Sequence, residues 1–221
     1  MVTEGNPRSD GDPAAPPVRR GSRGKYAKSA ERRRAIVLAA IEVFSKSGFR
    51  DGSLRDVAEK VGITHPGIRH HFPTKSDLLQ AVLRWREDEA LAKANRVRLD
   101  GIDVVHAWIA AVADNVQNPT LIELEFALAG EASSAGHPAH GHFARLYTKS
   151  EEILHRAFAV MRDRGQLRDG TEPALAARAM LACTQGVQAL WLRDRRIDIA
   201  EVLQAQLTVL LRDPLASKPV Q

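Results

Sequence analysis

Three histidines, His65, His70 and His71, lie close together in the stretch "GITHPGIRHHFPTKSDLL" at positions 62–79. Imidazole nitrogens bind metal ions and transfer protons near neutral pH, so the group first suggests a metal site or an acid–base centre. A helix turns by about 100° per residue, which places His65 and His70 about 140° apart. No two of the three have the i,i+3 or i,i+4 spacing that brings side chains to one face of a helix. The spacing therefore argues against a metal site, and we expect neither a metal ion nor a cofactor.

A second group, His137, His140 and His142, lies in "GHPAHGH". Three imidazoles could hold Zn²⁺ if a fourth ligand came from elsewhere in the chain. The stretch contains Pro138 and Gly141 but no cysteine or carboxylate at ligand spacing nearby. We therefore interpret it as a solvated loop between helices.

The positive charge of the chain is concentrated at its N-terminal end. Residues 1–76 contain 15 Lys and Arg against 8 Asp and Glu, a net +7, whereas the remaining residues contain 17 against 19, a net −2. Such asymmetry indicates a polyanionic partner for the first third of the chain. The alternative is a basic tail that only improves solubility.

Length and composition limit the class of protein. With 221 residues the chain can form one ordinary domain, or a small domain joined to a larger one. No apolar run approaches the roughly 18 residues of a membrane span, and the first residues lack the apolar core of a secretory signal. Cys183 is the single cysteine, which excludes an internal disulfide and fits a reducing compartment. We expect a cytoplasmic protein without a membrane partner.

A helical period runs through nearly every segment after position 29, and no alternating strand pattern occurs, so we expect an all-α protein. Residues 1–28 contain little to bury and are expected to be disordered. Helices are expected at 30–47, 54–61, 65–72, from 75 to about 99, and at 102–116, 120–134, 141–164, 171–193 and 198–212.

Capping residues define the second and third of these helices. Ser53 and Asp56 form a capping box, and Gly62 ends the second helix. Thr64 caps the third, and Pro66 fits in its first turn because that position needs no N–H partner. Two short helices joined by Gly-Ile-Thr and packed on a first helix make a helix-turn-helix.

The segment "RAIVLAAIEVFSKSGFRDGSLRDVAEKVGITHPGIRHHFPTKSDLLQAVL", residues 34–83, resembles the DNA-binding domain of the TetR family of transcriptional regulators. The match runs without a gap through the Phe-Gly end of the first helix, the Gly-Ile-Thr turn, the His-Phe pair and Lys75. The resemblance implies an N-terminal three-helix DNA-binding head and a larger C-terminal helical domain for ligand binding and dimerisation. The expected division is an arm at 1–28, the head at 29–75, the helical domain at 76–215 and a tail at 216–221.

The resemblance also implies a set of DNA-binding residues. His65, Pro66 and Gly67 are expected to face base edges, and Arg55 matches a position that can reach bases. Arg69 replaces the usual phosphate-binding tyrosine, His70 is expected at the DNA backbone, and Lys75 matches the phosphate-binding lysine. His71 is expected to turn inward. The full set is Arg55, Thr64, His65, Pro66, Gly67, Arg69, His70 and Lys75.

The basic residues before the first helix form a possible DNA-binding arm. They are Arg19, Arg20, Arg23, Lys25 and Lys28. We hypothesise that this arm lies along the adjacent minor groove, as basic arms of other helix-turn-helix proteins do. The alternative is an arm that only adds nonspecific attraction.

The last two expected helices carry a stripe of apolar and small residues that suits a homodimer interface across a two-fold axis. The stripe consists of Ala177, Met180, Leu181, Cys183, Thr184, Val187, Ala189, Leu190, Val202, Leu203, Leu207, Leu210 and Leu211. On pattern alone the same stripe could be the core of a monomer. A symmetric operator, which needs two reading heads, favours the dimer.

Candidates for an effector pocket are bulky or polar residues on otherwise apolar helix faces. They are Trp108, Glu123, Glu125, Phe126, Tyr147, Gln185, Gln188 and Trp191, of which Trp191 is expected mainly to pack. The sequence does not indicate which small molecule would bind.

These features lead to one main functional hypothesis. It is a dimeric transcriptional repressor that binds a palindromic double-stranded DNA operator and is released by a small-molecule effector. The alternatives are a constitutive or architectural DNA-binding protein without an effector, and an activator. An enzyme is not expected, because the sequence shows no nucleophile elbow, phosphate-binding loop or paired catalytic carboxylates.

The predicted roles of the recognition residues can be separated by DNA binding. Changing His65 to Ala should alter which DNA sequence is preferred, because a base contact is lost. Changing Arg69 or Lys75 to Ala should weaken binding to all sequences alike and lower the salt slope by roughly one unit per lost contact. An unchanged sequence preference in H65A would remove His65 from base recognition.

Overall fold

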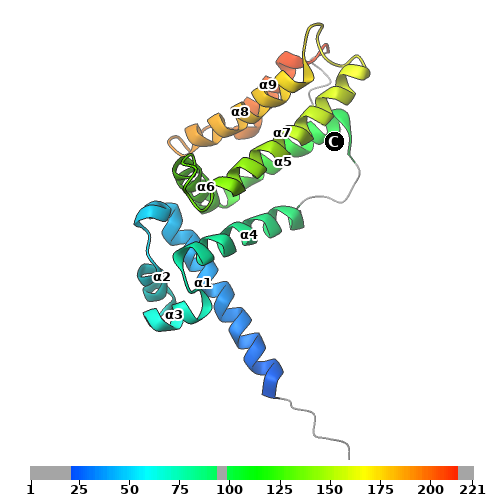
Figure 1. Ribbon diagram of the computed structural model, residues 1–221. Coiled ribbons are helices and arrows are strands. Elements are labelled where there is room, and N and C mark those ends of the chain that lie inside the picture. The colour runs from blue at the N-terminus through cyan, green and yellow to red at the C-terminus, as the bar shows by residue number, and fades with distance from the viewer. Residues whose placement is uncertain (1–20, 94–98, 214–221) are drawn as a thin grey trace, which may run out of the picture.

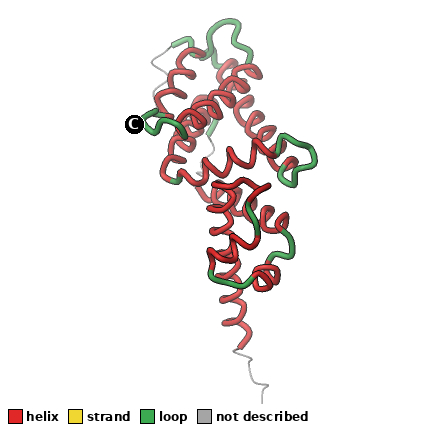
Figure 2. The backbone as a smooth tube through the Cα atoms, turned by 90° about the vertical axis from the view of Figure 1, so that its left-hand side faces the viewer, coloured by secondary structure: helices red, strands yellow, loops and turns green. Residues whose placement is uncertain are grey.

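The computed structural model describes residues 21–93 and 99–213, and within these ranges the regular elements are all helices (Figures 1 and 2). The nine α-helices are α1 (Gly21–Asp51), α2 (Leu54–Val61), α3 (His65–His71), α4 (Lys75–Lys93), α5 (Gly101–Asp114), α6 (Pro119–Glu131), α7 (His140–Asp163), α8 (Pro173–Trp191) and α9 (Ile199–Leu210). A short 3₁₀ helix, Asn115–Gln117, links α5 to α6. The all-α prediction is confirmed.

Local capping fixes the helices of the head as predicted. The hydroxyl of Ser53 accepts the N–H of Asp56 and the Asp56 carboxylate accepts the N–H of Ser53, which is the expected capping box. Gly62 ends α2 in the left-handed region with φ of 71°. The hydroxyl of Thr64 accepts the N–H of Gly67 at the start of α3. Short-range chemistry therefore defines the two helices of the helix-turn-helix.

α1 is longer than the sequence predicts. It begins at Gly21, whereas we expected the helix to begin near position 30 and residues 1–28 to be disordered. Residues 21–28 extend α1 at its N-terminal end because they contain no proline and directly precede a strong helical segment. Residues 1–20 lie outside the described part of the chain.

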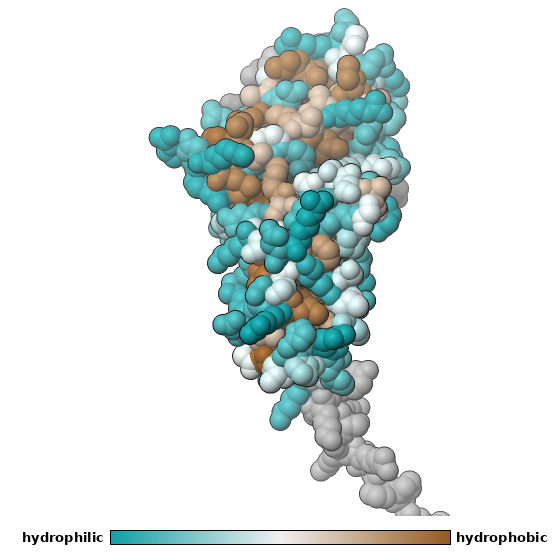
Figure 3. Space-filling model, turned by 60° about the vertical axis from the view of Figure 1, so that its left-hand side comes forward, coloured by the Kyte–Doolittle hydropathy of each residue, from teal (hydrophilic) through white to brown (hydrophobic). Residues whose placement is uncertain are grey.

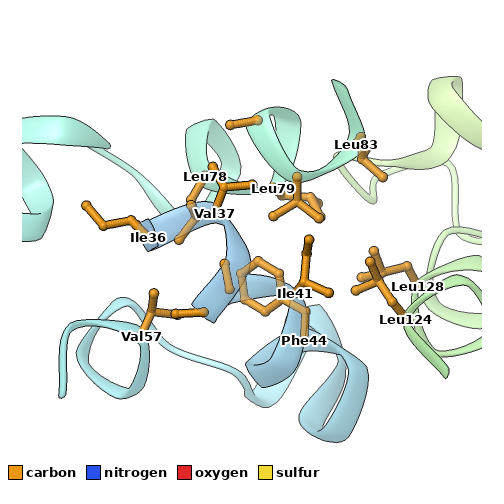
Figure 4. Close-up of a cluster of buried hydrophobic side chains, with 14 of the residues drawn as sticks. Ile36, Val37, Ile41, Phe44, Val57, Leu78, Leu79, Leu83, Leu124 and Leu128 are labelled. Carbon is orange, nitrogen blue, oxygen red and sulfur yellow. The ribbon is translucent and has the colours of Figure 1, made fainter. Parts of the chain in front are cut away.

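One apolar core joins the head to the C-terminal helices. Ile36, Phe44 and Leu79 are fully buried, and Leu124 and Leu128 of α6 pack into the same cluster (Figure 4). A second core lies among α5, α7, α8 and α9 and includes buried residues from all four. Because α6 and α7 each contribute to both cores, these two helices connect the head to the C-terminal helices.

Much of the stripe predicted for dimerisation is buried within the monomer. The buried members are Ala177, Met180, Thr184, Val187, Leu203, Leu207 and Leu211. The apolar residues left at the surface of α8 and α9 are Leu175, Leu190, Val202 and Val209. Figure 3 shows apolar residues exposed among polar ones on the C-terminal part of the molecule. Most of the stripe therefore serves the core of the single chain, whereas its members Leu190 and Val202 are exposed, and a dimer interface through them stays a prediction.

Within the described residues no helix is long and apolar enough to cross a membrane.

Candidate nucleic-acid interface

The recognition helix α3 has two distinct faces. Ile68, and Phe72 directly after the helix, are fully buried against the head. His65, Arg69 and His70 are exposed. The sequence therefore folds so that the apolar residues hold α3 in place and the basic residues face outward.

The other predicted DNA-binding residues of the helix-turn-helix are also accessible. Arg55 on α2, Thr64 and Pro66 are exposed, and Gly67 is half-buried. The Thr64 hydroxyl is engaged as the cap of α3, at 3.2 Å from the Gly67 nitrogen. The structure brings these residues to one end of the head, and their contacts with DNA stay predictions.

Positive charge gathers at the C-terminal end of α3. An Arg33 Nη donates to the carbonyl of His71 at 2.8 Å, and the guanidinium stacks on the Phe72 ring at 4.1 Å. The pKa of His71 is lowered, first by burial and then by the charges of His70, Arg33 and Arg32. His71 is half-buried, as expected for a side chain that turns inward. Sequence reasoning did not identify Arg33, because its contacts lie 38 residues away.

Lys75 performs a structural role that the sequence did not indicate. Its Nζ donates to the carbonyls of Phe49 at 2.7 Å, Gly52 at 2.9 Å and Arg50 at 3.0 Å, and it lies 4.6 Å from the centre of the Phe49 ring. An ammonium group has three protons, and all three have acceptors here. Lys75 thus satisfies the free carbonyls at the end of α1. Its contact with a DNA phosphate stays a prediction, and would require the ammonium to share or give up one of these carbonyls.

Glu131, at the end of α6, holds the same turn through its N–H groups. Its carboxylate accepts the N–H of Phe49 at 3.1 Å and the N–H of Arg50 at 3.1 and 3.3 Å. Gly48 has φ of 69°, and a Cβ at this position would lie 2.1 Å from a Glu131 oxygen. Glycine is therefore required by both the backbone conformation and the approach of the carboxylate. Residues 48–52, called the 48–52 turn below, are held by α4 on their carbonyls and by α6 on their N–H groups.

His137 packs beside this turn. Its ring is buried edge-on against Phe49 at 5.0 Å, and its Nε2 lies 3.3 Å from a Glu131 oxygen without hydrogen-bond geometry. Its Nδ1 accepts the N–H of Ala139 at 3.2 Å. His137 thus closes the outer side of the turn.

The remaining two histidines of "GHPAHGH" have separate partners. His140 Nδ1 lies 2.8 Å from the carbonyl of Ala132, and His142 Nδ1 lies 3.1 Å from a Glu87 oxygen. Burial lowers the pKa of His142, and Glu87 opposes that effect. In the described part of the chain no group of three or more His, Cys, Asp or Glu is arranged to hold a metal ion.

The predicted pocket residues do not form one site. Trp108 donates to the Thr184 hydroxyl at 3.0 Å, and Gln188 is buried and accepts from Asn115 at 3.4 Å. Phe126 packs on the second core, and Tyr147 packs on the first. Glu123 instead pairs with Arg195 at the surface, at 3.1 Å, because the side chain points away from the core.

Glu125 is the acidic residue that α6 turns inward. Burial raises its pKa, against the opposing effects of Arg86, whose Nη2 lies 3.9 Å from a Glu125 oxygen, and of a hydrogen bond from Gln185. Glu125 also raises the pKa of Tyr147, whose own burial has the larger effect. Together Arg86, Glu125, Tyr147 and Gln185 form a polar group contributed by α4, α6, α7 and α8.

Comparison with known proteins agrees with this arrangement. Residues 36–82 match the family model of bacterial regulatory proteins of the tetR family. The uncharacterised helix-turn-helix transcriptional regulator TtgW of Pseudomonas putida is 39% identical over 104 residues, which cover 44% of this chain and 72% of TtgW. The chain belongs to the TetR family. It is a TetR-family transcriptional regulator, and the resemblance inferred from residues 34–83 is confirmed.

Solved structures show the same fold over most of the chain. NalD, described as the secondary repressor of the MexAB-OprM multidrug efflux pump of Pseudomonas aeruginosa, superposes with a TM-score of 0.64 at 24% identity over 83% of this chain and 99% of NalD. The SmeT–triclosan complex superposes with a TM-score of 0.63 at 21% identity over 86% of this chain and 99% of SmeT. The C-terminal helices therefore share the TetR-family architecture as well.

The structural role of Lys75 in this TetR-family head can be tested by stability. Changing Lys75 to Met keeps the apolar stem but leaves three carbonyls without their charged donor. We expect the free energy of unfolding to fall by about 1.5–3 kcal/mol, the range for hydrogen bonds to a charged group. Chemical denaturation of the purified chain measures this directly.

Lys60→Met is the matched control. Lys60 pairs with Glu42 at the surface, and exposed pairs of this kind contribute less than about 1 kcal/mol. Equal stability of K75M and K60M would show that the Lys75 ammonium does not hold the turn in solution.

Proposed function

We propose that this TetR-family regulator is a homodimeric repressor that binds a palindromic DNA operator and is released by a small-molecule effector. The observation that carries the proposal is the division of α3 into a buried apolar face and an exposed basic face. An exposed recognition helix with His65 and Arg69 on its outer side has the form that enters a major groove.

The roles of the exposed residues follow from their chemistry. His65, Pro66 and Gly67 occupy the first turn of α3, where a recognition helix meets base edges. Arg69 and His70, one turn later, are proposed to contact phosphates, which set the register of the head on the duplex. Arg55 on α2, Thr64 at the cap of α3 and Lys75 at the start of α4 complete the proposed interface.

The homodimer is proposed to form through α8 and α9. Leu175, Leu190 and Val209 are 67%, 57% and 61% exposed in the single chain, which is costly for large apolar side chains gathered on one helix pair. Two copies related by a two-fold axis would cover them and present two copies of α3. The two half-sites would then lie about 34 Å apart or a multiple of that distance.

The effector is proposed to act on α6. Glu125 lies in the polar group formed with Arg86 and Tyr147, and Glu131 lies six residues further along the same helix, about 9 Å away. A ligand that displaced α6 near Glu125 would also move Glu131 away from the 48–52 turn. The SmeT–triclosan complex supports small-molecule binding in a protein of this fold.

A constitutive DNA-binding protein is the second candidate function. The observation that favours it is that the two best-formed hollows of the described chain, of about 410 and 620 Å³, are lined by none of the predicted pocket residues. Both hollows are open at the surface. An activator is the third alternative, because the sign of regulation depends on the position of the operator.

The proposal predicts the outcome of a selection from random DNA duplexes. The wild-type chain should enrich an inverted repeat, and light scattering should give twice the monomer mass of 24.3 kDa. Leu190→Glu should give the monomer mass, because a charge placed in the apolar contact must be desolvated. This variant should bind the selected duplex at least tenfold more weakly, since the second head no longer contributes.

Leu38→Glu controls for an acidic substitution at an exposed apolar residue, since Leu38 on α1 is 40% exposed and far from α8 and α9 in the chain. It should keep the dimer mass. A monomeric wild type, or an L190E chain that stays dimeric, would contradict the proposed interface. Enrichment of no sequence at all would contradict the proposed repressor.

A further inference from the structure

The N-terminal part of α1 extends beyond the head and is strongly basic. α1 begins at Gly21, and residues 27–35 are all exposed (Figure 1). Residues 27–34, called the α1 extension, contain four Lys and Arg against the single acidic residue Glu31. The α1 extension is therefore an exposed and positively charged part of the helix.

The rotation of the α1 extension is fixed by Arg33. Its guanidinium donates to the His71 carbonyl at 2.8 Å and stacks on the Phe72 ring at 4.1 Å, so this face of α1 is held against the end of the recognition helix. The position of every side chain around α1 then follows from the turn of about 100° per residue.

Lys28 and Arg32 lie on the flank of α1 that faces α2 and α3. They are four residues apart and therefore about 40° from each other. Lys28 is about 40° from Glu42 and Arg32 about 80° from it, so Arg32 is assigned to this flank by its effect on His71. Glu42 pairs with Lys60 of α2 at 2.7 Å, which marks this flank as the side of the helix-turn-helix. The charge of Arg32 also acts on His71 of α3.

Arg34 lies on the other flank. It is about 20° from Ile41, which points toward Leu124 and Leu128 of α6 (Figure 4). Two arginines that are two residues apart in one helix thus face different sides, Arg32 toward the recognition helix and Arg34 toward the C-terminal helices.

The α1 extension gains little stability from the protein itself. Apart from the contacts of Arg33, its residues are exposed, and like charges at i and i+4, such as Lys28 and Arg32, destabilise a helix by a few tenths of a kcal/mol. An anionic surface beside this flank would attract both Lys28 and Arg32 and thereby offset the repulsion between them. Charge complementarity therefore selects a polyanion as its partner.

We propose that Lys28 and Arg32 bind DNA phosphates that flank the half-site read by α3. The inference rests on the proposed function, in which α3 enters a major groove.

An α-helix with its side chains is about 10–12 Å across, whereas the minor groove is about 6 Å wide. The helical segment therefore lies across the phosphates and does not enter the minor groove, which replaces the minor-groove hypothesis for residues 21–28. Its contribution is independent of base sequence.

The test compares single variants of neighbouring residues on the duplex selected by the wild-type chain, with about ten extra base pairs on each side. Affinities of K28A, R32A and R34A are measured between 50 and 300 mM salt, in comparison with the wild type. Alanine is the strongest helix former, so the substitutions keep α1 helical. K28A and R32A are each expected to lower the salt slope by about 1.8 and the affinity at 0.15 M salt by about thirtyfold, the effect of one lost phosphate contact in each of the two heads.

R34A is the matched control and is expected to bind within twofold of the wild type, because a charge on the far flank lies beyond the screening length of about 8 Å. The ratio of affinities for the selected and a scrambled duplex should stay constant in all three variants. On a duplex without the extra flanking base pairs, R32A and R34A should have the same affinity and the same salt slope.

Equal salt slopes and affinities of R32A and R34A would overturn the inference. A change in the ratio of affinities for the selected and the scrambled duplex in K28A or R32A would also overturn it, because it would indicate base contacts. In both cases the wild type still binds its selected duplex, so the proposed repressor stands. A wild type that shows no sequence preference would overturn the proposed function and this inference with it.

Discussion

The orientation of the recognition helix depends on how the 48–52 turn is held. Lys75 donates to three carbonyls of this turn, and Glu131 accepts two of its N–H groups. The two side chains come from α4 and α6, one after and one far beyond the helix-turn-helix in the chain. Because α2 begins directly after the turn, any shift of these contacts changes the position of α2 and, through it, of α3. Gly48 is the residue that lets the carboxylate approach.

This arrangement makes α6 a connection between two cores. Leu124 and Leu128 pack into the core of the head, Ile122 packs among α5 and α7–α9, and Glu131 ends the helix at the turn. Glu125, half-way along, is held in a buried polar environment that raises its pKa. A single rigid helix thus touches the region proposed for an effector and the backbone that positions the recognition helix. Coupling between the two requires only a displacement of α6.

The parts of the fold that were predicted from the sequence are those governed by local chemistry. Ser53, Thr64 and Phe72 define the helix ends of the head because their partners lie within four residues. Lys75 and Glu131 were not assigned to the 48–52 turn, since their partners lie 23 to 82 residues away and no local pattern marks them. The apolar stripe of α8 and α9 was ambiguous because burial in a monomer and burial in a dimer select the same residue types.

The most direct test of this account is amide hydrogen exchange in a Glu131→Ala chain. If the carboxylate holds the 48–52 turn and thereby the helix-turn-helix, the Phe49 and Arg50 amides should exchange at least tenfold faster than in the wild type, and protection should also fall through α2 and α3. If only the Phe49 and Arg50 amides exchange faster and α3 stays as protected as in the wild type, the claim that the turn positions the recognition helix is contradicted.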